Sequence, residues 1–260
     1  MKDRLRAGYR PWIAICMPYD PDTTLGGHAA AFPLTRWSVI RAASEGEPMA
    51  RDALSAIIEL YWKPVYKYVR LHWKRSNEDA KDVVQSFFAA LLEQDMLSRF
   101  DPAKGTFRTW LRACVDHFVL KQNEFASRLK RGGHLPEPLD FDSAEGELAL
   151  AATNTSPEDL FFREWRRQAF TLALADLRRH CLSSGRSVQW EIFAAYDLAE
   201  AGRPRYADLA ARYNVSTDTV TNYLAWARRE LRRMVLERLA AVTSGGSELH
   251  SEARTLFGRP

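Results

Sequence analysis

The segment Phe100–Arg131 combines cationic side chains with aromatic rings, a mixture suited to nucleic acid. Residues 104–131 carry two acidic side chains and seven basic ones, which are Lys104, Arg108, Arg112, Lys121, Arg128, Lys130 and Arg131. Cations can follow a nucleic-acid backbone while rings accept unstacked bases, so this composition is typical of single-strand binding. Aromatic side chains also build cores, and we assign Phe107, Trp110 and Phe118 mainly to packing.

A second segment, residues 205–233, has the spacing of a helix-turn-helix. Asn214 stands where the turn needs a left-handed residue, and Ser216 is placed to cap the second helix. The core-facing positions of that helix are Val220, Leu224, Ala227 and Leu231, and the outward ones near its start are Thr217, Asp218, Thr221, Asn222 and Ala225. The outward positions would meet base edges in a major groove, and the arginines that follow suit phosphates. Because similar helix pairs occur in folds that never touch DNA, the motif alone leaves DNA binding open.

The segment Asp79–Leu92 predicts a helix with an unusually wide apolar face. On a helical wheel its apolar residues sweep roughly 200°, more than one core contact requires. Phe88 and Leu92 lie at one flank of this sweep. They border the polar residues Gln85 and Asp82, and such a mixture is expected where a partner helix docks. The alternative is a helix buried on two sides within its own domain.

Almost every periodic segment predicts a helix, and no alternating run of apolar and polar residues is long enough to require a strand. The predicted fold class is therefore all-α. Helices are expected at residues 35–44, 48–62, 65–72, 77–94, 106–131, 157–183, 187–201, 205–213 and 217–240. Pro64 is expected to interrupt the second of these helices, because proline lacks the backbone N–H that a helix interior uses.

The 260 residues are enough for two small domains with their connections. We divide the chain into a disordered leader at 1–33, a first domain at 34–133, an acidic flexible linker at 134–156, a helix-turn-helix domain at 157–240 and a polar tail at 241–260. The linker assignment depends on residues 135–162, which hold seven acidic residues, three prolines and no basic residue. Ser156 and Pro157 then have the cap and first-turn chemistry that starts a helix.

Composition excludes several classes of protein. The 37 basic residues exceed the 33 acidic ones slightly, which is compatible with a polyanionic partner without demanding one. The three cysteines lie far apart, so neither a disulfide framework nor a zinc knuckle is supported. No apolar run is long enough to span a membrane, and a cytoplasmic location fits best. An enzyme that uses Asp79 and Asp82 as metal ligands would lack adequate further ligands, so we expect neither a metal nor a cofactor.

The order of these motifs resembles an extracytoplasmic-function (ECF) sigma factor over about residues 35–240. Residues 82–88, Asp-Val-Val-Gln-Ser-Phe-Phe, are similar to the family's Asp-Leu-Val-Gln-Glu-x-Phe, which binds the clamp helices of the polymerase largest subunit. Residues 105–111, Gly-Thr-Phe-Arg-Thr-Trp-Leu, are similar to its Gly-x-Phe-Arg-x-Trp-Leu, which leads into promoter melting and recognition of the −10 hexamer. Residues 206–228 match its fourth-region helix-turn-helix, which reads the −35 hexamer.

The resemblance implies that the chain binds core RNA polymerase, directs it to a promoter and opens the duplex, without catalysis of its own. It assigns core-polymerase binding to Asp79, Asp82, Val83, Gln85, Phe88 and Leu92. It assigns −10 DNA binding to Arg108, Trp110, Arg112, His117, Asn123, Arg128, Lys130 and Arg131. It assigns −35 DNA binding to Arg205, Ser216, Thr217, Thr219, Thr221, Asn222, Trp226, Arg228 and Arg229. The implied partners are core RNA polymerase and promoter DNA, with an anti-sigma factor or a serine/threonine kinase as a further regulator, and with neither a membrane nor a small-molecule substrate.

The chain departs from the family pattern in both DNA-binding segments. His117 and Lys121 stand where an Asn and an Asp are usual. Thr221, Tyr223 and Trp226 occupy places often held by Lys or Arg, so phosphate anchoring there should be weaker. The alternative function is a stand-alone helix-turn-helix regulator that does not bind polymerase and whose first domain only dimerises.

Overall fold

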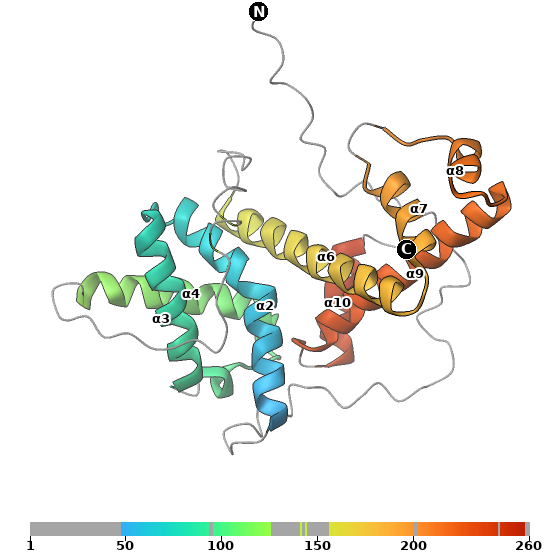
Figure 1. The fold of residues 1–260 in the computed structure, drawn as a ribbon. Coiled ribbons are helices and arrows are strands. Elements are labelled where there is room, and N and C mark those ends of the chain that lie inside the picture. The colour runs from blue at the N-terminus through green and yellow to red at the C-terminus, as the bar shows by residue number, and fades with distance from the viewer. Residues whose placement is uncertain are drawn as a thin grey trace, which may run out of the picture. The chain divides into compact units, whose positions relative to one another are not determined.

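The computed structural model describes residues 48–93, 96–125, 141, 144, 156–199, 202–243 and 245–257. Its elements are α2 (Pro48–Leu71), α3 (Asn77–Glu93), the 3-10 helix η3 (Met96–Arg99), α4 (Phe107–Phe125), α6 (Pro157–Ser183), α7 (Ser187–Asp197), α8 (Tyr206–Tyr213), α9 (Thr217–Ala240) and α10 (Gly246–Phe257) (Figure 1). Over the described ranges all regular secondary structure is helical, which confirms the predicted all-α class. The predicted leader, the helix at 35–44 and most of the acidic linker lie outside the described residues.

The chain divides into two compact units. Among the described residues, the larger unit holds α2, α3, η3, α4, the first part of α6 as far as Ala169, and everything from Arg238 onward, including α10. The smaller unit holds the described residues from Phe170 to Glu237, and therefore the rest of α6, α7, α8 and most of α9. The boundary thus falls inside α6, whereas the sequence analysis places it before that helix.

Helix α2 continues through Pro64, so the predicted interruption there is wrong. A proline in a helix interior removes one backbone hydrogen bond and crowds the preceding turn. Here the residues around it are almost completely buried, with Tyr61 at 2% exposure and Val65 and Tyr68 at 0%. Burial of such side chains offsets the local cost of the proline, because each contributes on the order of 2 kcal/mol.

The core of the larger unit is formed mainly by aromatic and branched side chains from α2, α3 and α4, and α2 packs against α3 (Figure 1). The Tyr61 ring meets Phe107 of α4 edge-on, with ring centroids 5.5 Å apart. The first part of α6 adds Phe161, whose ring stacks on Tyr61 at 6.5 Å. A buried ion pair also joins α2 to α6, with 2.7 Å between Lys67 Nζ and Glu164 Oε2.

The smaller unit contains helices α8 and α9 at the positions predicted for the helix-turn-helix. Asn214 ends α8 in the left-handed conformation, with φ 50° and ψ 50°. The Ser216 Oγ then accepts a hydrogen bond from the Thr219 N–H at 3.1 Å, which caps the start of α9. Leu209 of α8 and Val220 of α9 are buried. The predicted turn residue, cap and inward faces are therefore confirmed.

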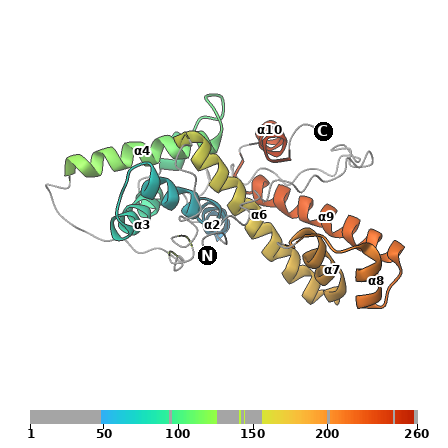
Figure 2. The same ribbon diagram turned by 90° about the horizontal axis from the view of Figure 1, so that it is seen from above.

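Helix α10 replaces the expected polar tail. Its buried residues are Leu249, Glu252, Ala253 and Leu256, which recur at the spacing of one helix face. Figure 2 shows α10, in red, as a separate helix that follows α9. The sequence contains this periodicity, but one of the four buried positions is a glutamate. A prediction that considers apolar residues alone therefore does not detect the helix.

Candidate functional site

The start of α3 is fixed locally and presents a polar face. The Ser76 Oγ accepts a hydrogen bond from the Asp79 N–H at 3.1 Å, and acidic residues occupy the first turn, where they favour the positive end of the helix. Asp79, Asp82 and Gln85 are exposed. The structure therefore brings together, on one accessible face, three of the residues assigned to polymerase binding.

The apolar residues assigned to the same interface lie elsewhere. Phe88 is 0% exposed and Val83 is 4% exposed. The Phe88 ring packs edge-on against Phe87, with ring centroids 5.3 Å apart. The expectation of Phe88 as an accessible anchor is therefore wrong, because the wide apolar sweep of α3 is covered within its own domain, as in the alternative interpretation. The side chain of Leu92 lies outside the described residues.

The aromatic residues at the start of α4 pack as expected. Phe107 is buried, and Trp110 is half-buried against Phe100 and Phe107, with ring centroids 5.5 and 5.4 Å apart. Phe118 packs edge-on against Phe87 at 5.6 Å. These contacts confirm a packing role for the three rings singled out from the sequence.

Arg108, assigned to −10 DNA binding, is held inside the larger unit. Its guanidinium donates a hydrogen bond to the Glu252 carboxylate of α10 at 2.9 Å. The same guanidinium carbon lies 4.6 Å from the ring centroids of both Phe162 and Trp165 on α6, which is cation–π geometry. In this conformation Arg108 is therefore partnered within the protein.

Arg112 is also partnered internally. It donates to Asp116 at 3.2 Å and lies 2.9 Å from the Glu158 carboxylate of α6. The Tyr68 hydroxyl donates to the same Asp116 at 2.9 Å, and burial raises the pKa of Tyr68. Trp73 Nε1 completes the cluster with a 3.0 Å hydrogen bond to Asp116. This network fixes α4 against α2 and α6, so Arg112 has a structural role that the sequence did not indicate.

The side of α4 that remains accessible carries His117, Leu120 and Lys121, all exposed. Leu120 is 51% exposed, and the sequence analysis missed it. Leu120 follows His117 by three residues, so helical spacing places both on the same side of α4, away from its buried face. This spacing could have identified Leu120 from the sequence. The side chains of Asn123, Arg128, Lys130 and Arg131 lie outside the described residues.

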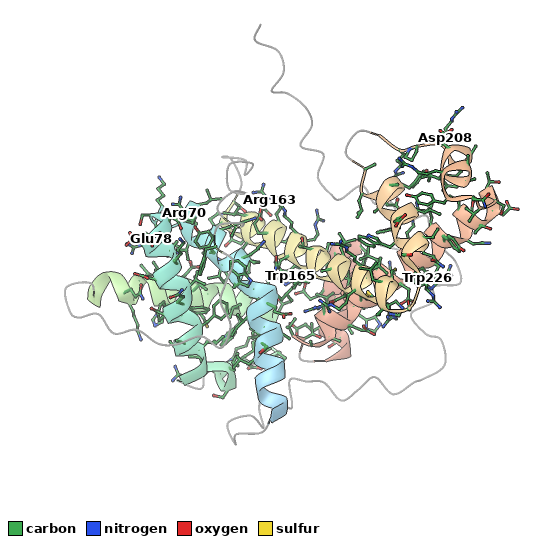
Figure 3. The ribbon with its side chains drawn as sticks, viewed as in Figure 1. Arg70, Glu78, Arg163, Trp165, Asp208 and Trp226 are labelled. Carbon is green, nitrogen blue, oxygen red and sulfur yellow. The ribbon has the colours of Figure 1, made fainter. Side chains whose placement is uncertain are left out.

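The outward face of the predicted helix-turn-helix is accessible near the start of α9. Thr217, Thr221 and Asn222 are exposed, as is the capping Ser216, and Thr219 is half-buried. Arg205 is exposed just before α8 and forms a 3.1 Å ion pair with Asp208, a residue labelled in Figure 3. The positions predicted to meet base edges are therefore together on one surface of the smaller unit.

Arg228 does not have the solvent-facing position that phosphate anchoring needs. Its Nε and Nη2 donate to the Asp197 carboxylate of α7 at 2.9 and 3.0 Å. The Asp197 side chain is 1% exposed and that of Arg228 is 17% exposed. The expectation that Arg228 is free for phosphate is therefore wrong, since it holds α9 to α7, whereas Arg229 is exposed.

Trp226 is also used for packing. Its ring stacks near His180 at the end of α6, with centroids 6.3 Å apart, and the Arg186 guanidinium lies 4.8 Å from its centroid. Figure 3 labels Trp226 among these side chains. Because Trp226 is half-buried, only part of its side chain is accessible for contact with DNA.

Two other features are absent from the part of the chain that the structure describes. There, no cluster of three or more His, Cys, Asp or Glu side chains could hold a metal ion. No described helix is both long enough and apolar enough to cross a bilayer.

Comparison with known proteins identifies one domain. A search of curated proteins and a search of solved structures gave no match. A comparison with known protein families matches residues 57–128 to sigma-70 region 2. The matched range begins within α2 and includes α3, η3 and α4, the helices whose core and exposed faces are described above. The chain therefore contains a sigma-70 region 2 domain.

Proposed function

We propose that this chain is a sigma factor of the ECF type, which binds core RNA polymerase and directs promoter-specific initiation. One observation carries the proposal: a sigma-70 region 2 domain is followed, in a second compact unit, by two helices whose turn and cap geometry is that expected of a helix-turn-helix. A region that meets the polymerase and the melted strand is thereby combined with a separate reader of duplex DNA. The chain acts without catalysis and in the cytoplasm.

The polymerase-binding surface is the exposed polar face of α3. Asp79, Asp82 and Gln85 supply two charges and a directional amide, while the buried side of the same helix keeps this face in position. Charged groups on a rigid helix favour both fast encounter and correct orientation of a partner. Val83 and Phe88 act indirectly, because they anchor α3 in the core.

The DNA-binding surfaces lie on both units. In the larger unit the accessible His117, Leu120 and Lys121 side of α4 meets the melted strand near the −10 hexamer, together with the basic residues that follow α4 in the sequence. In the smaller unit Thr221 and Asn222 at the start of α9 reach base edges of the −35 hexamer. Arg229 contributes a phosphate contact.

The polymerase contact is tested by binding of the full chain to purified core RNA polymerase. Asp82→Lys reverses a charge on the exposed face of α3, and Glu191→Lys makes the same change on an exposed position of α7. We expect Asp82→Lys to weaken core binding at least tenfold, and Glu191→Lys to leave it within twofold, with both variants folded by circular dichroism. Equal affinity of the two variants for core polymerase would contradict the assignment of this face.

A helix-turn-helix built from α8 and α9 would also serve a stand-alone DNA-binding regulator, since both helices and the turn between them belong to the smaller unit. The same assay separates the two functions. A chain that binds duplex DNA but shows no affinity for core polymerase would have this alternative function.

A further inference from the structure

Helix α10 covers the first turn of α4 in the larger unit. Glu252, itself 3% exposed, accepts a hydrogen bond from the Arg108 guanidinium at 2.9 Å. One turn earlier, Glu248 accepts a hydrogen bond from the Phe107 N–H at 2.7 Å. Two carboxylates of α10 thus bind an arginine and a backbone N–H in the first turn of α4.

These two donors suit a phosphate for the same reasons that they suit carboxylates. The first N–H groups of a helix have no partner within the helix and lie at its positive end, and a guanidinium offers directed donors to an anionic oxygen. Both donors belong to the segment Gly105–Leu111 that resembles the promoter-melting motif. The neighbouring Lys104 lies 3.4 Å from the Asp101 carboxylate, and 84% of its side chain is exposed. A strand that approached along Lys104 would reach Arg108 only after α10 had left.

The composition of α10 indicates a contact that can be released. Its twelve residues bury only three apolar side chains, Leu249, Ala253 and Leu256. Isolated helices of this length are marginal in water, so α10 depends on docking for its order. A buried carboxylate–guanidinium pair adds little net stability compared with apolar packing, but it does demand one specific partner. Such an interface is selective without being strong.

We infer that α10 is an internal competitor of single-stranded nucleic acid, whose Glu248 and Glu252 occupy the Arg108 surface of the region 2 domain until the strand displaces them. The inference rests on the proposed function and extends its strand-binding surface from the His117, Leu120 and Lys121 side of α4 to the start of that helix. Release of α10 then exposes Arg108 and the first turn of α4 to the backbone of the strand. The stacking of Arg108 on Phe162 and Trp165 keeps the guanidinium in place after α10 leaves.

The test measures the affinity of the full chain for a fluorescent oligo-dT strand, which the helix-turn-helix does not read. Glu248→Gln with Glu252→Gln removes two charges and keeps the apolar face of α10. The control, Glu78→Gln with Glu191→Gln, removes two charges at exposed positions of α3 and α7. We expect the α10 variant to bind the strand at least fivefold more tightly than the control variant. Adding Arg108→Gln should abolish this gain. A gain no greater than that of the control, or one that persists without Arg108, would overturn the inference.

Amide hydrogen exchange of the wild-type chain provides a readout that does not require a variant. Saturation with the strand should raise exchange in residues 246–257 at least severalfold, while the buried part of α2 stays protected. Strand binding with unchanged protection of α10 would overturn the competition and leave the proposed function standing. If neither the wild type nor any variant binds the strand, and the chain also fails to bind core polymerase, the inference and the proposed function both fail.

Discussion

The ion pair between Arg228 and Asp197 predicts that two neighbouring arginines of α9 have different roles. Arg228→Ala leaves the Asp197 carboxylate, 1% exposed, without its bidentate partner. Breaking a buried pair in this way typically costs about 3–5 kcal/mol. Arg203 lies 3.7 Å from the same carboxylate and retains part of the interaction, so we expect a loss of about 2–3 kcal/mol in the free energy of unfolding. Arg229→Ala, at an exposed position, should change the free energy of unfolding by less than about 0.5 kcal/mol.

Urea unfolding of the full chain, followed by circular dichroism, measures the difference between these variants. Because urea slopes are about 1–3 kcal/mol per molar, the midpoint for Arg228→Ala should fall by on the order of 1 M in the transition of the smaller unit. In an Asp197→Asn background, Arg228→Ala should lower the free energy of unfolding much less, because position 197 then has no buried negative charge to leave unpaired. On duplex DNA, Arg229→Ala should weaken all sequences alike and reduce the salt slope by about 1. Equal unfolding midpoints for the two alanine variants would refute a structural role of Arg228.

Three further predictions concern the larger unit. Phe88→Ala should lower the free energy of unfolding by about 3–5 kcal/mol in urea, because it creates a cavity in a fully buried site; a loss of polymerase binding without destabilisation would contradict this placement. Lys67→Met should cost about 3 kcal/mol, because the buried Glu164 carboxylate then keeps only its 3.4 Å contact with Arg163, and adding Glu164→Leu should restore most of the loss; a double variant no more stable than the single one would argue against this pairing. Burial raises the pKa of Glu252 above its ordinary value of 4.5, although Arg108 opposes the shift, so the folded state binds this proton more tightly. Stability should therefore fall relative to Glu252→Gln as the pH rises through the folded pKa, and a parallel pH dependence of the two proteins would contradict the shift.

The features that local chemistry determines were predictable from the sequence. Ser76, Ser156 and Ser216 each cap a helix through a side-chain oxygen that reaches a backbone N–H three residues later. Asn214 takes the left-handed conformation that its turn requires. These features depend on a few consecutive residues, so their positions follow from residue type and spacing.

The features that depend on distant partners were not predictable in this way. Phe88 shows a broad apolar flank in the sequence, but only the folded domain shows what covers it. Arg228 belongs to a basic run, and its partner Asp197 lies 31 residues earlier. Glu252 looks like a solvated acid of a polar tail, yet its partner Arg108 lies 144 residues away. A single sequence shows which of these residues are charged, but it does not show which residue each of them pairs with in the folded protein.

Run-off transcription with purified core RNA polymerase tests the central claim most directly. Genomic promoter fragments would be transcribed with core polymerase alone, with the full chain added, and with the Asp82→Lys variant added. We predict discrete transcripts with the wild-type chain and none with core polymerase alone. The amount of transcript should fall at least tenfold with Asp82→Lys and stay at the wild-type level with Glu191→Lys. If the wild-type chain produces no transcript above core polymerase alone on any fragment, although it is folded and binds duplex DNA, it is not a sigma factor.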